Sequence, residues 1–353
     1  MKQASPSPVF GLVVPVYNVR RYLPEALTSF LNQTYSNIRI YIVDDGSTDG
    51  SSAILSKYSA LDNRLKVFYQ PNMGVSRARN RALEELEREN LVSYVSFIDS
   101  DDKLDPQYCE RFVQEMLNAD VDYGVCAYKS FTRFSTREPK QSIETVFKQL
   151  NNQEVIEHFF NISINNPTVS LPKDATVSLF LANRCFRADL IKGIRFDEKL
   201  PNCEDQDFLI RVLSKIQKGI IIPKTLFYYR KRASSLSNSL KSKHNDFLVF
   251  ESFYKQKATL SNPIRIGIEN DFVSYLYQEM NGVLAYEKDA SIRRGCYKKA
   301  LDYVSEFKSP LTPVAEKKIR RILKGYQYNF CYAKARKGLS FIRNLIRKIK
   351  YFP

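Results

Sequence analysis

The chain has 353 residues, of which 44% are hydrophobic and 26% are charged. This length and composition suit one large folded domain with an appendage, and they exclude a disordered chain and a bundle of membrane helices. No apolar run approaches the roughly 20 residues that a helix needs to span a bilayer. The formal net charge is +16, and Lys317–Pro353 contains twelve Lys or Arg and no Asp or Glu. That segment predicts an anionic partner.

The cysteine pattern indicates a reducing compartment. The six cysteines are scattered without a CxxC pair, and the chain has only two histidines. Free, mostly buried thiols are therefore favoured over disulfides or a zinc site. The first residues lack the small-residue cleavage site of a secretory signal peptide. We expect a cytoplasmic protein.

Strands and helices are expected to alternate through the first 130 residues. Apolar and β-branched runs predict strands at residues 9–16, 38–43, 65–69, 94–98 and 121–128. Apolar residues at helical spacing predict helices at residues 22–33, 51–60, 75–88 and 106–118. This alternation is typical of an α/β fold with a mainly parallel sheet flanked by helices.

Acidic side chains follow two of these strands where each strand ends. Asp44 and Asp45 follow the second strand, and Asp99, Asp101 and Asp102 follow the fourth. Because ligands bind outside the carboxyl ends of the strands in open α/β sheets, we expect these acids at one functional edge. Carboxylate oxygens suit a hard divalent ion such as Mg²⁺ or Mn²⁺. The alternative is a solvated loop, since Asp and Ser also favour turns.

The pattern changes in the second half of the chain. Between residues 130 and 177 only a short helix near 154–160 is expected. A helix opens at Glu204 with its apolar residues on one face, and short strands are expected at 219–223 and 226–229. Beyond about Ser239 the chain is expected to be mostly helical.

An ordered set of segments resembles glycosyltransferase family 2. The segments are Val13–Asn18, Val43–Asp49, Asn72–Asn80 and Asp99–Asp102, followed by Asn183–Arg187, Glu204–Asp205, and Tyr229 and Arg230 with Ser234 and Ser235. The resemblance covers roughly residues 9–240. It implies a GT-A fold, a nucleotide-sugar donor, a divalent cation and inversion at the anomeric carbon. We accordingly expect a catalytic domain at 1–238, with a nucleotide-sugar half at about 9–128 and an acceptor half at 129–238, and a helical region at 239–353.

The acids after the fourth strand are the expected metal site. Asp101 is predicted to be the principal ligand, because a metal there can bridge the diphosphate oxygens of the donor as a Lewis acid. Asp99 is expected to be its partner or a ribose contact. Asp102 is expected only to support the loop.

Further residues are expected to bind the donor. A carboxylate at Asp44 or Asp45 can accept hydrogen bonds from a uracil N–H or from ribose hydroxyls, whereas an Asx-turn is the alternative for one of them. By resemblance, Arg79 contributes to donor binding. Pro15 and Tyr17 line the base pocket by resemblance, with a strand end and a packed aromatic ring as the alternatives.

Asp205 is the expected general base for the acceptor hydroxyl. It lies in the first turn of a helix, where the helix dipole favours the ionised carboxylate. Glu204 is the next candidate and is expected to orient the acceptor. The alternative is that these acids only stabilise the helix start. Arg230 is expected to close over the diphosphate as a second clamp, although a run of three cations is usually a solvated turn.

The basic tail has two interpretations. Lys334–Phe352 carries apolar residues at helical spacing among Lys and Arg, which is typical of a helix that lies on an anionic membrane surface. That interpretation suits an acceptor glycan on a polyprenyl diphosphate carrier at the inner face of the cell membrane, as the resemblance suggests for cell-surface polysaccharides. The alternative is a helix packed on the catalytic domain.

Two other functional classes fit parts of the sequence. A sugar nucleotidyltransferase also places carboxylates and a divalent ion at a sheet edge, but it usually has a Gly-rich phosphate loop near its first strand, and none follows Val16. A nucleic-acid-binding protein is indicated by the basic tail alone, without a stacking or groove-reading motif. We therefore expect no nucleic-acid partner.

Overall fold

The computed structural model describes residues 7–132, 148–160, 181–200, 203–232, 251–255, 261–307 and 311–327, together with residues 329 and 333. These residues fall into two compact units, with the described residues up to 232 in the first unit and those from 251 onward in the second. The domain boundary predicted at residue 238 and the amphipathic helix predicted at residues 334–353 lie outside the described residues.

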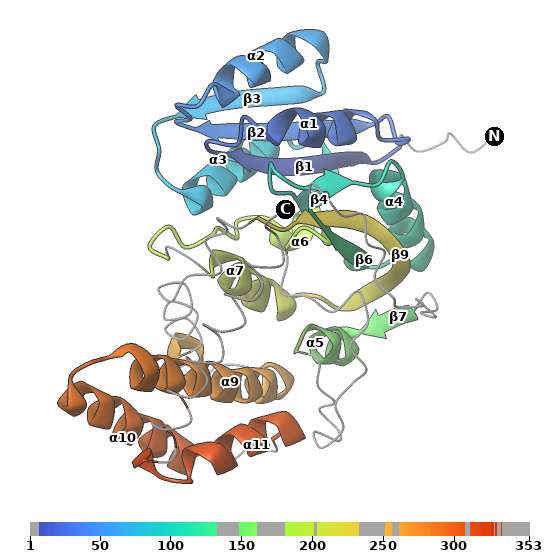
Figure 1. Ribbon diagram of the computed structural model, residues 1–353. Coiled ribbons are helices and arrows are strands. Elements are labelled where there is room, and N and C mark those ends of the chain that lie inside the picture. Colours follow the sequence, from blue (N-terminus) through green and yellow to red (C-terminus); the bar gives the residue numbers. More distant parts are fainter. Residues whose placement is uncertain are drawn as a thin grey trace, which may run out of the picture. The chain divides into compact units, whose positions relative to one another are not determined.

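The first unit alternates strands and helices at its start (Figure 1). Its first elements are β1 (Val9–Val16), α1 (Leu23–Leu31), β2 (Ile38–Asp45), α2 (Ser51–Leu61), β3 (Leu65–Gln70), α3 (Val75–Glu89) and β4 (Val92–Phe97). They are followed by β5 (Lys103–Leu104), α4 (Tyr108–Ala119), β6 (Tyr123–Phe131), β7 (Lys148–Asn151), α5 (Asn152–Phe160), β8 (Arg184–Arg187), α6 (Ala188–Ile191), α7 (Glu204–Leu213) and β9 (Lys218–Arg230). The short strands β5 and β7 have no counterpart among the predicted elements, because two to four residues give too little periodicity to detect.

The strands form one mixed sheet in the order β3-β2-β1-β4-β8-β6-β9-β5, with β7 paired to β9. The strands β3, β2, β1 and β4 are parallel, as expected for strands joined by helices. The next strand, β8, is antiparallel to both β4 and β6. The expectation of a mainly parallel sheet therefore holds for the first half of the unit. The second half is mixed because β8 enters the sheet between β4 and β6 from much later in the chain.

The last strand corrects another expectation. Two short strands were predicted around Pro223, whereas β9 runs without a break from Lys218 to Arg230. Its register with β6 shifts after Cys126, so that Ala127 faces Thr225 and Pro223 lies within the irregularity. A proline is tolerated at such a bulge because no ladder hydrogen bond is required there. The continuous strand carries Arg230 to the same edge of the sheet as the acidic loop.

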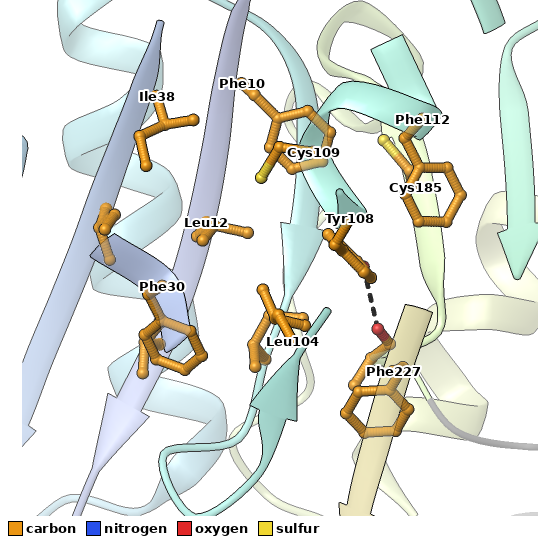
Figure 2. Close-up of a cluster of buried hydrophobic side chains, with 14 of the residues drawn as sticks. Phe10, Leu12, Phe30, Ile38, Leu104, Tyr108, Cys109, Phe112, Cys185 and Phe227 are labelled. Carbon is orange, nitrogen blue, oxygen red and sulfur yellow. Dashed lines mark hydrogen bonds between the residues drawn. The ribbon is translucent and has the colours of Figure 1, made fainter. Parts of the chain in front are cut away.

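The core of the first unit lies between the sheet and the helices α1 and α4 (Figure 2). Alternate residues of a strand point to opposite faces, and one face of β1 contributes Phe10, Leu12 and Val14 to this cluster. The two helices contribute Leu23, Ala26, Leu27, Phe30, Tyr108, Cys109, Phe112, Val113 and Met116. The hydroxyl group of Tyr108 donates to the carbonyl oxygen of Ala182 at 3.0 Å, which satisfies a polar group in an apolar interior.

The opposite face of β1 is covered closely by α3. A Cβ atom at Gly11 would lie 2.9 Å from Val92 Cγ1 and 3.1 Å from Leu86 Cδ1. The glycine therefore allows the helix to approach the strand. This close packing fixes the position of α3, whose first turns carry Arg79.

The second unit is helical in the described residues, as expected. It contains α9 (Asn262–Tyr286), α10 (Ala290–Glu306) and α11 (Pro313–Ile322). The side chain of Asp289 accepts hydrogen bonds from the amide groups that open α10, and Thr312 does the same for α11. No helix in the described part of the chain has the length and apolar character required to cross a membrane.

The core placement gives a stability prediction. Phe30→Ala should lower the free energy of unfolding by about 3–5 kcal/mol, because truncation of a fully buried ring leaves a cavity. Leu61 ends α2 and is 77% exposed, which makes it the control. Leu61→Ala should change the same quantity by less than about 0.5 kcal/mol. Denaturant titration followed by circular dichroism measures both, and equal losses would contradict the core described above.

Candidate active site

One buried guanidinium joins the loop after β4 to the start of α7. Arg79 in α3 donates through one terminal nitrogen to Glu204 Oε1 at 2.8 Å and to Asp205 Oδ1 at 2.7 Å. Its other terminal nitrogen donates to Asp99 Oδ1 at 3.0 Å. Arg79 is only 3% exposed. Burial lowers the pKa of Arg79, but Asp205, Asp99 and Glu204 together raise it above the ordinary arginine value, so the cation is permanent.

A cluster of three aromatic rings packs against the guanidinium group of Arg79. The guanidinium carbon of Arg79 lies 5.2 Å from the centroid of the Phe196 ring. Phe196 stacks on Phe208 of α7 with ring centroids 4.3 Å apart, and Phe97 at the end of β4 contacts both rings edge to face. The same cluster therefore packs the strand before the acidic loop against the helix that carries Asp205.

Asn80 fixes the segment that supplies Phe196. Its side-chain amide donates to the Phe196 carbonyl oxygen at 3.0 Å, and its side-chain oxygen accepts from the Phe196 amide at 2.8 Å. This paired contact holds an irregular segment against α3. The two residues at the start of α3 thus organise the site together, Arg79 through charge and Asn80 through the backbone.

The environment of Asp205 differs from the sequence-based expectation. Burial raises the pKa of Asp205 to about 8, with Glu204 and Asp99 adding to the rise and Arg79 opposing it. The helix dipole was expected to favour the ionised carboxylate, but burial, together with the neighbouring acids, outweighs it. A carboxyl group whose pKa lies near neutrality suits a general base, because its proton affinity then matches the operating pH.

The acidic loop is held by the end of β9. The amide of Arg230 donates to Asp102 Oδ1 at 2.7 Å, and the Arg230 side chain donates from Nε to the carbonyl oxygen of Asp101 at 2.6 Å. Asp101 Oδ2 lies 2.7 Å from Nε of Arg232. Burial and the charge of Asp99 raise the pKa of Asp101, while Arg232 lowers it. Burial, Asp101 and Asp99 likewise raise the pKa of Asp102.

The metal prediction depends on these carboxylates. Within the described ranges, no group of three or more His, Cys, Asp or Glu side chains is arranged to hold a metal ion. A Mg²⁺ ion, however, keeps several waters and is usually bound by one or two carboxylates together with substrate phosphates. Asp101 and Asp99 fit that requirement, since both carboxylates lie in the loop directly after β4 and the Asp99 side chain is 45% exposed. The second oxygen of Asp102 is also buried without a hydrogen-bond partner.

Arg230 is not a solvated turn residue. It is 7% exposed, and a terminal nitrogen of its guanidinium group lies 2.7 Å from Oε2 of Glu25. The guanidinium carbon lies 4.4 Å from the centroid of Phe131 and 5.0 Å from that of Tyr22. These contacts give Arg230 a structural role in positioning the loop. Its predicted contact with the donor diphosphate stays a prediction.

Asp44 and Asp45 are both engaged with their own loops. Asp44 accepts a hydrogen bond from the amide of Ser47 at 3.0 Å, which is the Asx-turn considered as the alternative. Asp45 accepts from the amides of Met73 and Gly74 at 2.9 and 2.8 Å and so fixes the loop that leads into α3. Each carboxylate oxygen can accept a further hydrogen bond, so these contacts leave room for a nucleotide. The predicted contacts with the nucleotide remain predictions.

The two residues predicted for the base pocket lie where β1 ends. Pro15 is paired with Val43 inside the sheet, and the side chain of Tyr17 directly after the strand is 47% exposed. An exposed aromatic ring at this edge is available to a ligand rather than packed in the core. The contact of Pro15 and Tyr17 with a base is still a prediction.

Two residues of this edge escaped the sequence analysis. Glu25 in α1 lies within 2.8 Å of Lys103 and within 2.7 Å of Arg230. Arg232 was treated as part of a solvated turn, yet it pairs with Asp101. A signal existed for Glu25, which lies in the first turn of the helix after the first strand. The partner of Arg232 is far away in the sequence and had no local signal.

A small pocket opens at the centre of this arrangement. Its polar lining comes from Arg79, Asp99, Asp102 and Asp205, and its apolar lining includes Phe97 and Phe227. The acidic loop and the candidate base therefore share one cavity. This is the geometry expected where a donor and an acceptor meet.

The fold and this acidic edge resemble those of glycosyltransferases of the GT-A type. Residues 12–171 match the model of the family "Glycosyl transferase family 2". The resemblance inferred from the sequence segments is thereby confirmed.

Curated relatives agree with this family. The chain is 29% identical over 250 residues to "Putative glycosyltransferase EpsH" of Bacillus subtilis, covering 70% of this chain and 66% of that protein. It is 33% identical over 228 residues to "Glycosyltransferase GlyA" of Streptococcus pneumoniae, covering 64% of this chain and 31% of that protein. The chain thus spans less than two thirds of the length of these relatives.

A solved structure confirms the fold. The S. aureus TarS fragment 1-349 in complex with UDP-GlcNAc matches with a TM-score of 0.66 at 20% identity, covering 93% of this chain and 92% of that one. At 20% identity the match shows similarity of fold and nothing further.

The contacts of Arg79 give a prediction that does not require an activity assay. Arg79→Gln should lower the free energy of unfolding by about 2–4 kcal/mol near neutral pH, because three carboxylates lose their shared cation. The loss should be smaller at pH 5 than at pH 8, since protonated carboxyl groups need no counter-ion.

The control for this prediction is Arg77→Gln. Arg77 pairs with Glu84 and Glu198 but is 32% exposed, so its removal should cost less than about 1 kcal/mol. Denaturant titrations of both variants at the two pH values provide the measurement. A loss at Arg79 that is independent of pH would contradict the charge balance described above.

Proposed function

We propose that the protein is an inverting glycosyltransferase that moves a hexose-type sugar from a nucleotide-sugar, with UDP as the favoured nucleotide, to a hydroxyl group of a growing cell-surface glycan. The observation that carries this proposal is the bridge from Asp99 through Arg79 to Asp205, because it brings the acidic loop after β4 and the carboxyl group of Asp205 to one pocket. The TarS structure with UDP-GlcNAc and the curated "Putative teichuronic acid biosynthesis glycosyltransferase TuaG", 28% identical over 231 residues, support the donor and acceptor classes.

The donor diphosphate is proposed to bind beside the acidic loop. Asp101 and Asp99 would hold Mg²⁺ or Mn²⁺ there, and the ion would supply the positive charge that stabilises a departing nucleoside diphosphate. A solved mannosyltransferase from Pyrobaculum calidifontis, which matches with a TM-score of 0.51 at 14% identity, was crystallised with GDP-Man and Mn²⁺. Arg230 donates to the Asp102 carboxylate and to the backbone carbonyl oxygen of Asp101. These bonds would hold the carboxylates of Asp99 and Asp101 in a defined orientation toward the donor.

The transfer step is a single displacement. The oxygen of the acceptor hydroxyl forms a bond to the anomeric carbon while the bond from that carbon to the diphosphate oxygen breaks. The hydroxyl proton passes to the carboxylate of Asp205, whose raised pKa makes it an effective acceptor. Glu204 shares Arg79 with Asp205 and is proposed to orient the acceptor. Attack from the side opposite the leaving group inverts the anomeric carbon.

The proposal is tested first with a donor screen. The protein is incubated with Mn²⁺ and a panel of UDP-, GDP- and dTDP-sugars, and the release of nucleoside diphosphate by slow hydrolysis is measured. We expect turnover with a UDP-sugar. Failure of every donor to bind or turn over would contradict the proposed function, and release of pyrophosphate from a nucleoside triphosphate and a sugar phosphate would indicate a nucleotidyltransferase instead.

Two substitutions separate donor binding from transfer. Asp101→Ala should lose metal-dependent donor binding, whereas Asp205→Asn should bind the donor normally and lose transfer by about 10²-fold or more, as expected for removal of a general base. Calorimetry with UDP and a transfer assay distinguish the two effects.

Asp207→Asn is the matched control for the second substitution. Asp207 lies in the same helical turn, but its carboxylate bonds Arg211 rather than Arg79, so this variant should retain transfer. Near wild-type transfer by Asp205→Asn would show that the base assignment is wrong.

The acceptor is proposed to be linked to a lipid, with the protein bound peripherally at the inner face of the cell membrane. The support is the charge of the last residues, in which Lys334–Phe352 combines basic and apolar side chains at helical spacing. Flotation with vesicles that contain anionic phospholipid should recover the full chain but not a chain that ends at residue 333. Equal recovery of the two chains would remove this part of the proposal.

A further inference from the structure

The carboxylate proposed as the principal metal ligand already has a cationic partner. Arg232 follows the end of β9, and its Nε atom lies 2.7 Å from Oδ2 of Asp101. The Asp101 side chain is 10% exposed and the Arg232 side chain is 30% exposed. The carboxylate of the pair is therefore largely buried, whereas the guanidinium group is accessible to solvent.

The position of Arg232 is set by rigid neighbours. Two residues earlier, Arg230 is fixed to the acidic loop by bonds to Asp101 and Asp102. The amide of Lys231 donates to the carbonyl oxygen of Phe131 at 2.9 Å, which continues the pairing of β9 with β6. The guanidinium carbon of Arg232 lies 5.5 Å from the centroid of the Tyr22 ring. Arg232 therefore lies only two residues after the end of β9, and this places its guanidinium group against Asp101.

The neighbouring cations, Arg230 and Arg79, are buried and have other partners. Arg230 is 7% exposed, and its guanidinium lies between two aromatic rings and contacts Glu25. Arg79 is held by three carboxylates. Among the cations at this edge in the described residues, Arg232 is the one that combines contact with a predicted metal ligand and access to solvent.

We propose that Arg232 is a built-in counter-ion that a divalent cation must displace from Asp101, so that the donor-free protein binds the metal weakly and binds it well only together with the donor. This inference rests on the metal site assigned under the proposed function and adds a residue that sets its affinity. A guanidinium and a divalent ion repel each other when they share one carboxylate. Metal binding therefore has to break the ion pair of Arg232.

The donor removes this penalty. Its diphosphate adds negative charge beside Asp101, and that charge accommodates the displaced guanidinium and the metal at the same time. The affinities of metal and nucleotide are then linked, and each ligand must raise the affinity of the other by the same factor. The consequence is that Asp101 is not occupied by a free metal ion in the absence of substrate.

The test measures Mn²⁺ binding without activity. Free Mn²⁺ is titrated by electron paramagnetic resonance against the full chain, with and without UDP. Arg232→Gln should tighten Mn²⁺ binding in the absence of UDP by about tenfold, and the factor by which UDP improves Mn²⁺ binding should shrink correspondingly. Arg232→Lys keeps a cation at this position and should remain close to the wild type.

Two further variants make the test specific. Arg195→Gln removes an arginine of nearly equal exposure, 31%, whose partner Glu87 lies away from the acidic loop, so it should leave Mn²⁺ binding unchanged. Asp101→Asn should abolish the tightening when combined with Arg232→Gln. Thermal unfolding of each variant verifies that it is folded.

The outcomes separate this inference from the function on which it rests. If the wild type binds Mn²⁺ in the presence of UDP but Arg232→Gln binds it no more tightly without UDP, the counter-ion role is wrong and the metal site stands. If no variant binds Mn²⁺ under either condition, the metal assignment at Asp101 falls, and the inference falls with it. If Arg195→Gln tightens binding as much as Arg232→Gln, the effect is one of net charge and the inference is overturned.

Discussion

The bonds of Arg79 to three carboxylates are the contact on which the rest of the site depends. Asp99, Asp101, Asp102, Glu204 and Asp205 converge on one edge of the sheet, and this much like charge in a partly buried place is unfavourable unless cations are fixed among it. Arg79 meets this need for the two acids of α7 and for Asp99. The cation is buried and permanent, and it fixes the spacing of these three acids.

The same contact explains why chain segments so distant in sequence act as one site. The acidic loop follows β4, and Asp205 lies in the first turn of α7 more than a hundred residues later. The rings of Phe97, Phe196 and Phe208 pack these two elements together beneath the charges. Under the proposed function, displacement at a sugar carbon requires the donor and the acceptor to be in line, and a fixed distance between the loop and the helix would meet that requirement.

The predictable part of this protein is the part encoded locally. The alternation of strands and helices gave β1 to β4 and their helices, and the acids at the strand ends could be assigned to one edge without a structure. The partners of those acids could not be assigned. Arg79 reaches Glu204 and Asp205 across 125 and 126 residues, and Arg232 reaches Asp101 through β9. Such contacts depend on how the antiparallel half of the sheet is assembled, which periodicity does not encode.

The structure also divides the acids of this edge into two kinds that the sequence presents alike. Asp44 and Asp45 end β2, and their carboxylates accept hydrogen bonds from backbone amides of adjoining loops as well as from the side chains of Ser52 and Gln70. Their oxygens therefore hold the backbone in place. Asp99 and Asp101 follow β4 and are paired instead with the side chains of Arg79 and Arg232. Arg79 is buried and held by three carboxylates, but the Arg232 side chain is 30% exposed and can rotate away when a ligand offers a better partner. A backbone amide cannot do so without a change in the fold. Under the proposed function, the pair of Asp101 and Arg232 is therefore the contact with which a ligand would compete.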